Sequence, residues 1–424
     1  MFINSKFLVG LMYLLAIFVG PCSKADTPKF SFDGFANIGL TYSDSENILY
    51  RSSILNKGRE GLSLLPDTWI GLQTSIVLSQ RMDAVGQVIM QDRWDDNVSN
   101  YIELLFLRYQ LDRNSYFKLG RFSTSSYLFT DSRYVSQSYA WVRAPIDQYS
   151  AVGAVGNMNG LQFGWMGDIG PGMLKGTISF GNNEFNNDRN EEFMLTYDNL
   201  IAAKLELSTL NWRGQIAHIE ATIEELVFSG IDTVKELDEL YPGPLQGFAQ
   251  QIQSAMLADG KRVKYSSIGL QYAHNDLEFI AEYGKYDSSW AFASSTSFSY
   301  VSVLYGIGDQ TFFLTLGETD RKHATSLFDL EEARSSLQPS LFEFLKQASA
   351  PLTESVRSNV FDQQSISLGV RWDTSINWSI KAQFDHYRIN EFGSGFFTVP
   401  ENAIATLNSF QTLNVLNISF STTF

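Results

Sequence analysis

The chain ends in LNVLNISFSTTF, residues 413–424, and this stretch decides the fold. Its last apolar residues all stand at even positions, and the residues between them are polar. Alternation with period two predicts a β-strand with one apolar and one polar face. Most chains end in a frayed polar segment. A strand that stays amphipathic up to a terminal aromatic residue therefore predicts an end that is paired with another strand. The apolar positions are Leu416, Ile418, Phe420 and Phe424.

The first residues carry a different pattern. MFINSKFLVGLMYLLAIFVGPCSKAD has a basic residue, Lys6, then an apolar run, then small residues. This is the pattern of a secretory signal peptide, and the run is too short for a membrane span. We expect residues 1–25 to be cleaved and 26–424 to form the mature chain. An acylated Cys22 is the alternative, although Pro21 directly before it does not suit that processing. Cleavage would remove the one Cys and leave an exported chain without disulfides.

The charge balance of the mature chain is acidic. Loss of Lys6 and Lys24 from the 31 basic residues leaves 29 against 46 acidic residues, a formal charge of −17. Such a balance argues against nucleic-acid binding, which needs a basic surface. No later stretch reaches the length of a transmembrane helix. An exported, aromatic-rich chain of this kind is either a secreted all-β protein or an outer-membrane β-barrel, whose lipid contacts are spread over alternate residues.

Alternation recurs along the whole mature chain and predicts sixteen strands. Residues 30–43 alternate over about fourteen residues, whereas a spanning strand needs only about 9–11 and an ordinary strand has about five or six. In 193–208 the apolar residues fall on odd positions, which predicts one apolar face. Two stretches, 84–94 and 295–305, are mixed on both faces. The sixteen predicted strands are 30–43, 67–79, 84–94, 101–111, 115–122, 157–167, 173–181, 193–208, 212–222, 264–274, 277–287, 295–305, 310–320, 363–373, 376–387 and 408–424.

The connections between these strands alternate in length, which predicts a barrel rather than a secreted sandwich. Outer-membrane barrels have short periplasmic turns and long extracellular loops. The long connections are 44–66, 95–100, 123–156, 182–192, 223–263, 288–294, 321–362 and 388–407. Within two of them, 244–258 and 339–347, apolar residues recur at helical spacing. These helices either pack over the barrel mouth or bind a partner.

The mature chain resembles a sixteen-stranded Gram-negative outer-membrane porin of the gammaproteobacterial general type. FSFDGFANIGLTYS, residues 30–43, is similar to the first strand of such porins. YFKLGRFSTSSYLFTDSRYVSQSYAWVRAPIDQY, residues 116–149, looks like their segment around the third loop. The acidic third-loop motif of the best-known enterobacterial porins is absent, so their pore details are not carried over.

The resemblance implies an all-β fold: a transmembrane antiparallel β-barrel whose third loop, 123–156, folds into the lumen and narrows it. It implies the outer membrane as location, a homotrimer, and contact with lipid and lipopolysaccharide. The C-terminal alternation that ends in Phe424 resembles the signal by which the barrel-assembly machinery recognises its substrates.

A polar lumen suits passive diffusion of small polar solutes and ions, with selectivity set by pore width and by the charges at the narrowest zone. The mixed signs of the candidates leave open whether anions or cations are preferred. The loop candidates are Asp131, Arg133, Arg143 and Asp147. The wall candidates, from the polar faces of the strands, are Asp33, Arg108, Lys118, Lys175, Glu278, Glu282, Arg371, Lys381 and Asp385.

Other functions remain as alternatives. Aromatic residues crowd 123–156, and they either form a track for sugars or pack the loop against the wall. The barrel could be selective for one solute class, or its long loops could act as an adhesin or receptor. An enzyme is not expected, because the chain has no Gly-x-Ser-x-Gly elbow. No cofactor or metal centre is expected; the pair Asp95–Asp96 or Asp320 could at most hold divalent cations between lipopolysaccharides.

Overall fold

The structure is a computed structural model, and the part described here comprises residues 29–94, 98–150, 156–186, 194–227, 231–240, 246–288, 290, 295–321, 334, 338–340, 342–343, 346–347, 360–391 and 393–424. In this part of the chain sixteen long strands form one closed antiparallel barrel, and a three-residue strand, β2 (Gly61–Ser63), pairs with its rim. The predicted fold class is confirmed, and each of the sixteen predicted strands overlaps one observed strand. The predicted leader, 1–25, lies outside the described residues.

The strands differ from their predicted bounds by a few residues at their ends. They are β1 (Lys29–Ser43), β3 (Trp69–Ser79), β4 (Met82–Gln91), β5 (Ile102–Gln110), β6 (Ser115–Ser123), β7 (Asn157–Ile169), β8 (Gly172–Asn186), β9 (Met194–Ser208), β10 (Trp212–Val227), β11 (Arg262–His274), β12 (Leu277–Ser288), β13 (Thr296–Ile307), β14 (Gln310–Arg321), β15 (Gln363–Ser375), β16 (Trp378–Ile389) and β17 (Gln411–Thr423).

The C-terminal strand closes the barrel. β1 pairs with β17 on one side and with β3 on the other, so the sheet has no free edge. The register places Leu40 opposite Ile418. The last residue is itself paired, because the backbone N–H of Phe424 donates to Gly34 at 2.8 Å and that of Gly34 donates back at 2.7 Å. In a closed sheet the backbone N–H and C=O groups of every strand can pair with a neighbouring strand, which membrane-spanning strands require.

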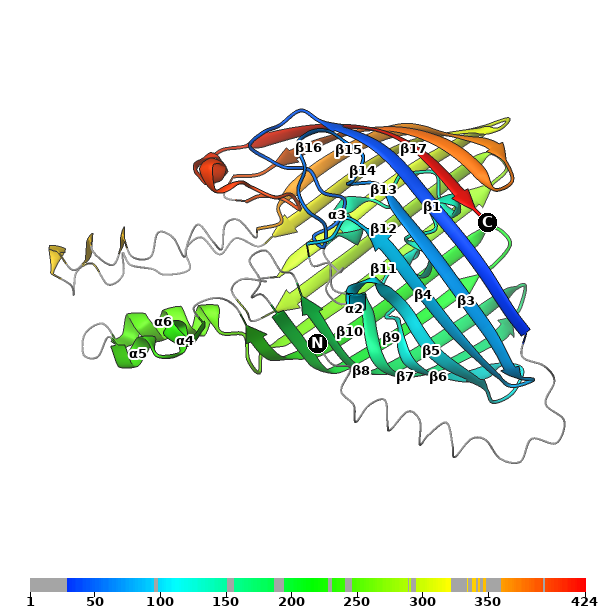
Figure 1. Cartoon of the computed structure of the whole chain (residues 1–424), viewed down its shortest axis with the longest axis horizontal. Coiled ribbons are helices and arrows are strands. Elements are labelled where there is room, and N and C mark those ends of the chain that lie inside the picture. Colours follow the sequence, from blue (N-terminus) through cyan, green and yellow to red (C-terminus); the bar gives the residue numbers. More distant parts are fainter. Residues whose placement is uncertain are drawn as a thin grey trace.

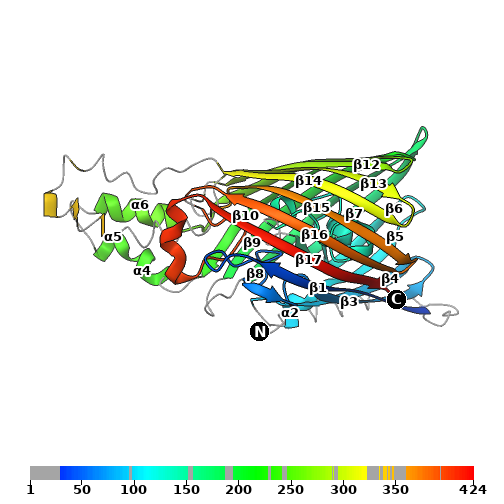
Figure 2. The same cartoon turned by 90° about the horizontal axis from the view of Figure 1, so that it is seen from above.

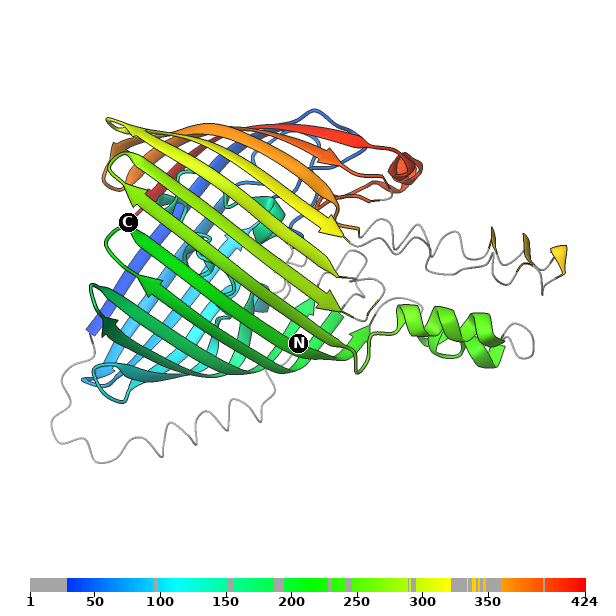
Figure 3. The same cartoon turned by 180° about the vertical axis from the view of Figure 1, so that it is seen from behind.

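The two ends of the barrel differ. Connections at the end that holds the C-terminus are two to four residues long, for example 275–276 between β11 and β12. At the other end they are long, and helices α4 (Ile231–Lys235), α5 (Leu237–Leu240) and α6 (Gln246–Met256) project beyond the rim (Figures 1 and 3). The 3₁₀ helix η6 (Glu401–Asn408) lies at the same end (Figure 2). By the asymmetry of outer-membrane barrels, the short turns are periplasmic.

The predicted loop helices are found in part. α6 lies inside the predicted range 244–258. Of the range 339–347, residues 339–340, 342–343 and 346–347 are helical, and the others lie outside the described residues. Among the described residues, no helix is both long and apolar enough to cross a membrane.

The outer face of the barrel is apolar. Side chains such as Ile268, Leu314 and Ile418 are exposed on it, which suits contact with lipid chains rather than with water. Aromatic residues lie near the short-turn end, where the rings of Trp212 and Tyr272 are in contact, tilted by 36° with centroids 4.2 Å apart. Such residues form the interfacial girdles of outer-membrane barrels.

The prediction of one apolar face for the whole of 193–208 is wrong. Leu195 and Tyr197 point inward and are buried, whereas Ile201 and Leu205 are exposed on the outer face. The phase changes at Asn199, which has a positive φ of 50°, next to irregularities in its pairing with β8 and β10. An extra residue in a strand shifts the side-chain alternation by one. Odd-numbered apolar residues of β9 therefore face the interior before Asn199 and the lipid after it.

Candidate pore and its internal loop

In the connection between β6 and β7, the described residues 124–150 fold into the lumen and cross it. They form short helical turns, including α3 (Ile146–Tyr149), which contacts β12, β13, β14 and β15 from inside (Figure 1). The backbone N–H of Leu128 donates to Glu282 on β12 at 2.9 Å. The indole N–H of Trp141 lies 3.0 Å from Thr315 on β14. The loop is thus hydrogen-bonded to strands that follow it by more than a hundred residues.

Two basic residues of the barrel wall, on β15 and β16, bind the backbone of this loop. The Lys381 ammonium group, fully buried, donates to the carbonyl oxygens of Tyr139 at 2.9 Å and Trp141 at 2.7 Å, and also to the carbonyl and hydroxyl of Ser136. The Arg371 guanidinium donates to the carbonyl of Gln137 at 2.8 Å. A buried charge is tolerated only when its hydrogen bonds are satisfied. Loop carbonyls supply them here.

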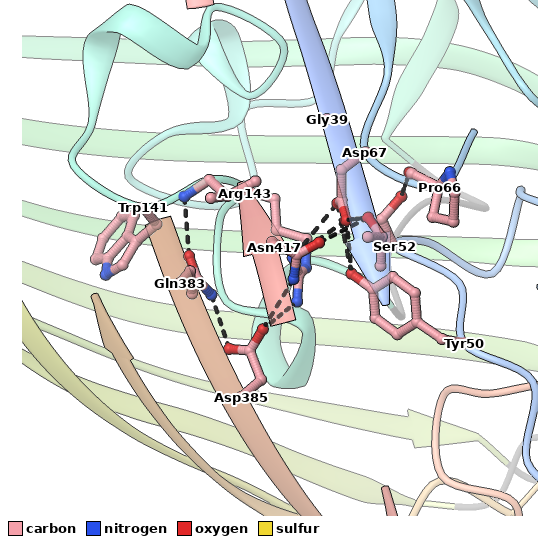
Figure 4. A network of polar contacts seen from close by, with 12 residues as sticks. Gly39, Tyr50, Ser52, Pro66, Asp67, Trp141, Arg143, Gln383, Asp385 and Asn417 are labelled. Atoms are coloured by element: carbon pink, nitrogen blue, oxygen red, sulfur yellow. Dashed lines mark hydrogen bonds and ion pairs between the residues drawn. The ribbon is translucent and has the colours of Figure 1, made fainter. Parts of the chain in front are cut away.

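Arg143 of the loop forms a buried ionic triad with two carboxylates (Figure 4). Its guanidinium lies 2.5 Å from Asp385 on β16 and 3.4 Å from Asp67, which precedes β3. The hydroxyl of Tyr50 donates to Asp67 at 3.2 Å. Gln383 links the triad to the loop backbone. Its side-chain amide donates to Asp385 at 2.7 Å, and its side-chain oxygen accepts a hydrogen bond from the backbone N–H of Val142. The triad joins two loops to the barrel wall.

Two further carboxylates, those of Asp147 and Glu103, also take part in contacts between the loop and the barrel wall. Asp147 accepts hydrogen bonds from Gln363 at 2.8 Å and Ser365 at 2.5 Å, both on β15. Burial raises the pKa of Asp147 to about 6, even though these hydrogen bonds act to lower it. Arg133 forms an ion pair with Glu103 of β5. The loop is therefore bound on opposite sides of the barrel.

An apolar core lies inside the barrel at the long-loop end. Lumen-facing residues of β9, β10, β11, β16 and β17 pack there against connections 44–68 and 390–410. Within this core the rings of Tyr50 and Phe397 are 6.0 Å apart, and the two connections pair through the bridge of Leu49 with Thr398. Members of this core include Ile54, Leu200, Ile223, Tyr387, Ile389, Phe396, Leu413 and Val415. The inner face of the barrel is thus polar only over part of its length.

This packing explains the two stretches that are mixed on both faces. Ile89 of β4 points inward and packs with Phe35 and Trp69. On β13, Tyr300 and Leu304 point inward and pack against loop residues. Strands whose inner face contacts a folded loop are apolar on both faces, so period-two alternation weakens in them.

The wall between β4 and β10 stays open toward the short-turn end. Side chains of Arg108, Lys175 and Arg213 are 43%, 40% and 32% exposed. Lys118 lies over the ring of Phe106 at 4.8 Å, and Lys204 is held between carboxylates. Because they share one surface, we call Arg108, Lys118, Lys175, Lys204 and Arg213 the basic wall.

Three carboxylates lie among these cations. Asp83 pairs with Arg108 at 2.9 Å. Glu206 lies 3.6 Å from Lys175 and 3.2 Å from Arg213. Asp131 comes from the internal loop, its side chain is 66% exposed, and it lies 3.8 Å from Lys204. Asp131 therefore presents a loop carboxylate to the basic wall.

The predicted site residues thus lie in two environments. Seven of them form hydrogen bonds or ion pairs that join the internal loop to the barrel wall. They are Arg133, Arg143 and Asp147 on the loop, and Glu282, Arg371, Lys381 and Asp385 on the wall. Five lie on the wall elsewhere: Asp33, Arg108, Lys118, Lys175 and Glu278. Asp131 faces the basic wall. Whether any of them sets the constriction stays a prediction.

Several residues of the site were not predicted. Lys204 and Glu206 stand on the polar face of 193–208 and could have been read from the alternation. Asp67 and Glu103 gave no such signal. Asp67 precedes its strand, and Glu103 lies at an irregularity between β4 and β5 that turns it inward to Arg133.

The aromatic residues of the loop pack rather than line open space. Phe129, Tyr139 and Trp141 are buried against β12–β14, and the rings of Phe129 and Trp141 meet edge to face at 5.6 Å. No group of three His, Cys, Asp or Glu side chains in the described residues could hold a metal ion. Asp95 and Asp96 lie outside that part, and Asp320 is exposed on β14.

No known protein family and no curated protein matches the sequence. Solved structures do match the fold. One is OmpF of Salmonella typhi in complex with daunomycin, with a TM-score of 0.51 at 11% identity over 95% of this chain and 100% of that one. Another is an anion-selective porin from Comamonas acidovorans, with a TM-score of 0.50 at 9% identity over 94% and 100%. The chain therefore has the sixteen-stranded fold of the outer-membrane porins, as its sequence predicted.

Proposed function

We propose that this protein is an outer-membrane porin that lets small hydrophilic solutes and ions diffuse passively through its lumen. The observation that carries the proposal is the basic wall. Charged side chains that point into a closed barrel and stay exposed, such as Arg108 and Lys175, need water around them. A water-filled lumen inside an apolar belt is the arrangement of a porin.

The proposal includes the route by which the protein reaches the membrane. Residues 1–25 act as a leader that is removed on export. The outward-facing residues Leu416, Ile418, Phe420 and Phe424 act as the signal for the barrel-assembly machinery. Ile418 and Phe424 are exposed on the outer face of the barrel, so their side chains are not needed to fill its interior. The mature barrel contacts lipid and lipopolysaccharide, assembles as a homotrimer and catalyses no reaction.

A planar bilayer tests the channel. Purified protein whose folded state is verified by heat-modifiable migration should give discrete conductance steps, in groups of three if it is a trimer. Conductance that grows in proportion to salt supports free diffusion. A folded barrel that gives no steps, and that transports no small solute in liposome swelling, contradicts the proposal.

The apolar core at the long-loop end favours a second candidate, a substrate-selective channel. Connections 44–68 and 390–410 bury Phe396 and Phe397 inside the mouth, so the path for solutes is narrower there than an open barrel would allow. A selective channel should show small conductance that saturates with salt and is blocked by one class of solute. Block by a solute class, tested in the same bilayers, distinguishes it from a general porin.

A further inference from the structure

Docking of the internal loop removes carboxylates from the accessible surface of the lumen. Six of the buried acidic residues, each less than a tenth exposed, face the interior in the described part of the barrel: Asp67, Glu103, Asp147, Glu206, Glu282 and Asp385. Five of the six touch the loop or belong to it. Arg143 neutralises two of them, Arg133 neutralises Glu103, and Glu282 accepts from the Leu128 N–H and the Tyr300 hydroxyl. These carboxylates cannot meet a passing solute.

Three cations of the basic wall, Arg108, Lys175 and Arg213, remain accessible, whereas the Lys204 side chain is only 9% exposed. The five cations of the wall lie with three carboxylates, Asp83, Asp131 and Glu206, on one surface, and one of the three, Glu206, is buried beneath its partners. Lys118 interacts electrostatically with Asp131 and Asp83 and with the basic groups of Arg108 and Lys204, and Arg108 stands opposite it on the neighbouring strand. The surface therefore has an excess of positive charge, although the chain as a whole carries −15.

Charge of one sign on a surface enclosed by low-dielectric walls raises the local concentration of ions of the other sign. We propose that the basic wall makes this channel selective for small anions, with Arg108, Lys118 and Lys175 as its selectivity residues. The inference rests on the proposed channel function and adds its substrate class. Asp131 opposes the cations from the loop and limits the preference.

The test is the reversal potential in a tenfold KCl gradient across a planar bilayer. The wild type should be anion-selective. The triple variant R108Q/K118Q/K175Q should lose several-fold in the chloride-to-potassium permeability ratio, and D131N should raise that ratio. The effect should shrink in concentrated salt, because screening shortens the range of each charge.

The outer face offers a matched control. Arg262, Lys264 and Lys285 are exposed on the outside of β11 and β12, so R262Q/K264Q/K285Q makes the same charge change outside the lumen and should leave the permeability ratio unchanged. A cation-selective wild type, or equal shifts in the two triple variants, overturns the inference and leaves the channel standing. Absence of conductance from every folded variant overturns the channel function itself, and the inference with it.

Discussion

The two ends of the lumen differ in the polarity of the side chains on the inner face of the barrel. Toward the long loops the barrel wall packs on an apolar core that includes Tyr50, Phe396 and Leu413. Toward the short turns the wall between β4 and β10 carries exposed charges such as Arg108 and Lys175. One set of strands passes through both regions. The difference shows that the inner face of a barrel is polar only where water fills it, and that folded loops turn the remainder into a protein core.

The largest expected effect comes from the buried triad. R143L leaves Asp67 and Asp385 buried without a cation, which costs about 3–5 kcal/mol of unfolding free energy. We expect a lower denaturant midpoint for barrels in lipid vesicles, and larger, noisier conductance because the loop is released. The control is R113L in the exposed turn 111–114. An unchanged midpoint would show that the triad does not hold the loop.

The apolar core is tested by F396A. Phe396 is fully buried and stacks near Phe361 with centroids 4.7 Å apart. Removing a buried ring costs about 3 kcal/mol or more through lost burial and the cavity that remains. Denaturant unfolding should show this loss, whereas F410A, at a half-exposed ring, should cost far less. Similar losses in the two variants would mean that the long-loop end is not packed as a core.

Lys381 tests the contact between the wall and the loop backbone. K381M keeps most of the side-chain volume but leaves buried carbonyl groups at Tyr139 and Trp141 without their donor, at a cost of about 2 kcal/mol. The same substitution in the open wall, K175M, should change stability by less than about 0.5 kcal/mol. Vesicle unfolding measures both. Equal effects would remove the distinction between the docked and the open wall.

The smallest effect concerns pH. The pKa of Asp147 is raised to about 6, whereas an unfolded aspartate titrates near 3.9. The folded barrel therefore holds a proton that the unfolded chain releases between about pH 4 and 6. Its unfolding free energy should fall over that window and stay level above it.

D147N should remove this slope from the pH profile of unfolding. D168N changes an exposed carboxylate near a short turn and should retain the slope. A wild-type profile that is flat or rising between pH 4 and 6 would show that Asp147 is ionised in the folded loop.

Much of the barrel could be predicted from sequence because lipid contact imposes a local rule. Every second residue of a spanning strand faces the bilayer, so stretches such as 363–373 show their outer face directly. The site was harder to predict. Arg371 and Lys381 stand on the polar face as expected, yet they bind loop carbonyls, and the acceptors lie about 240 residues away in sequence. No local pattern encodes such a contact.

By itself the sequence determined the strands, their number, the short and long connections, and the terminal pairing of Phe424, because alternation and turn length are properties of neighbouring residues. Only the tertiary structure decided which lumen charges are buried and which are open. That choice depends on where residues 124–150 dock, on the phase change at Asn199, and on the packing of loops whose residues meet only when the barrel has closed.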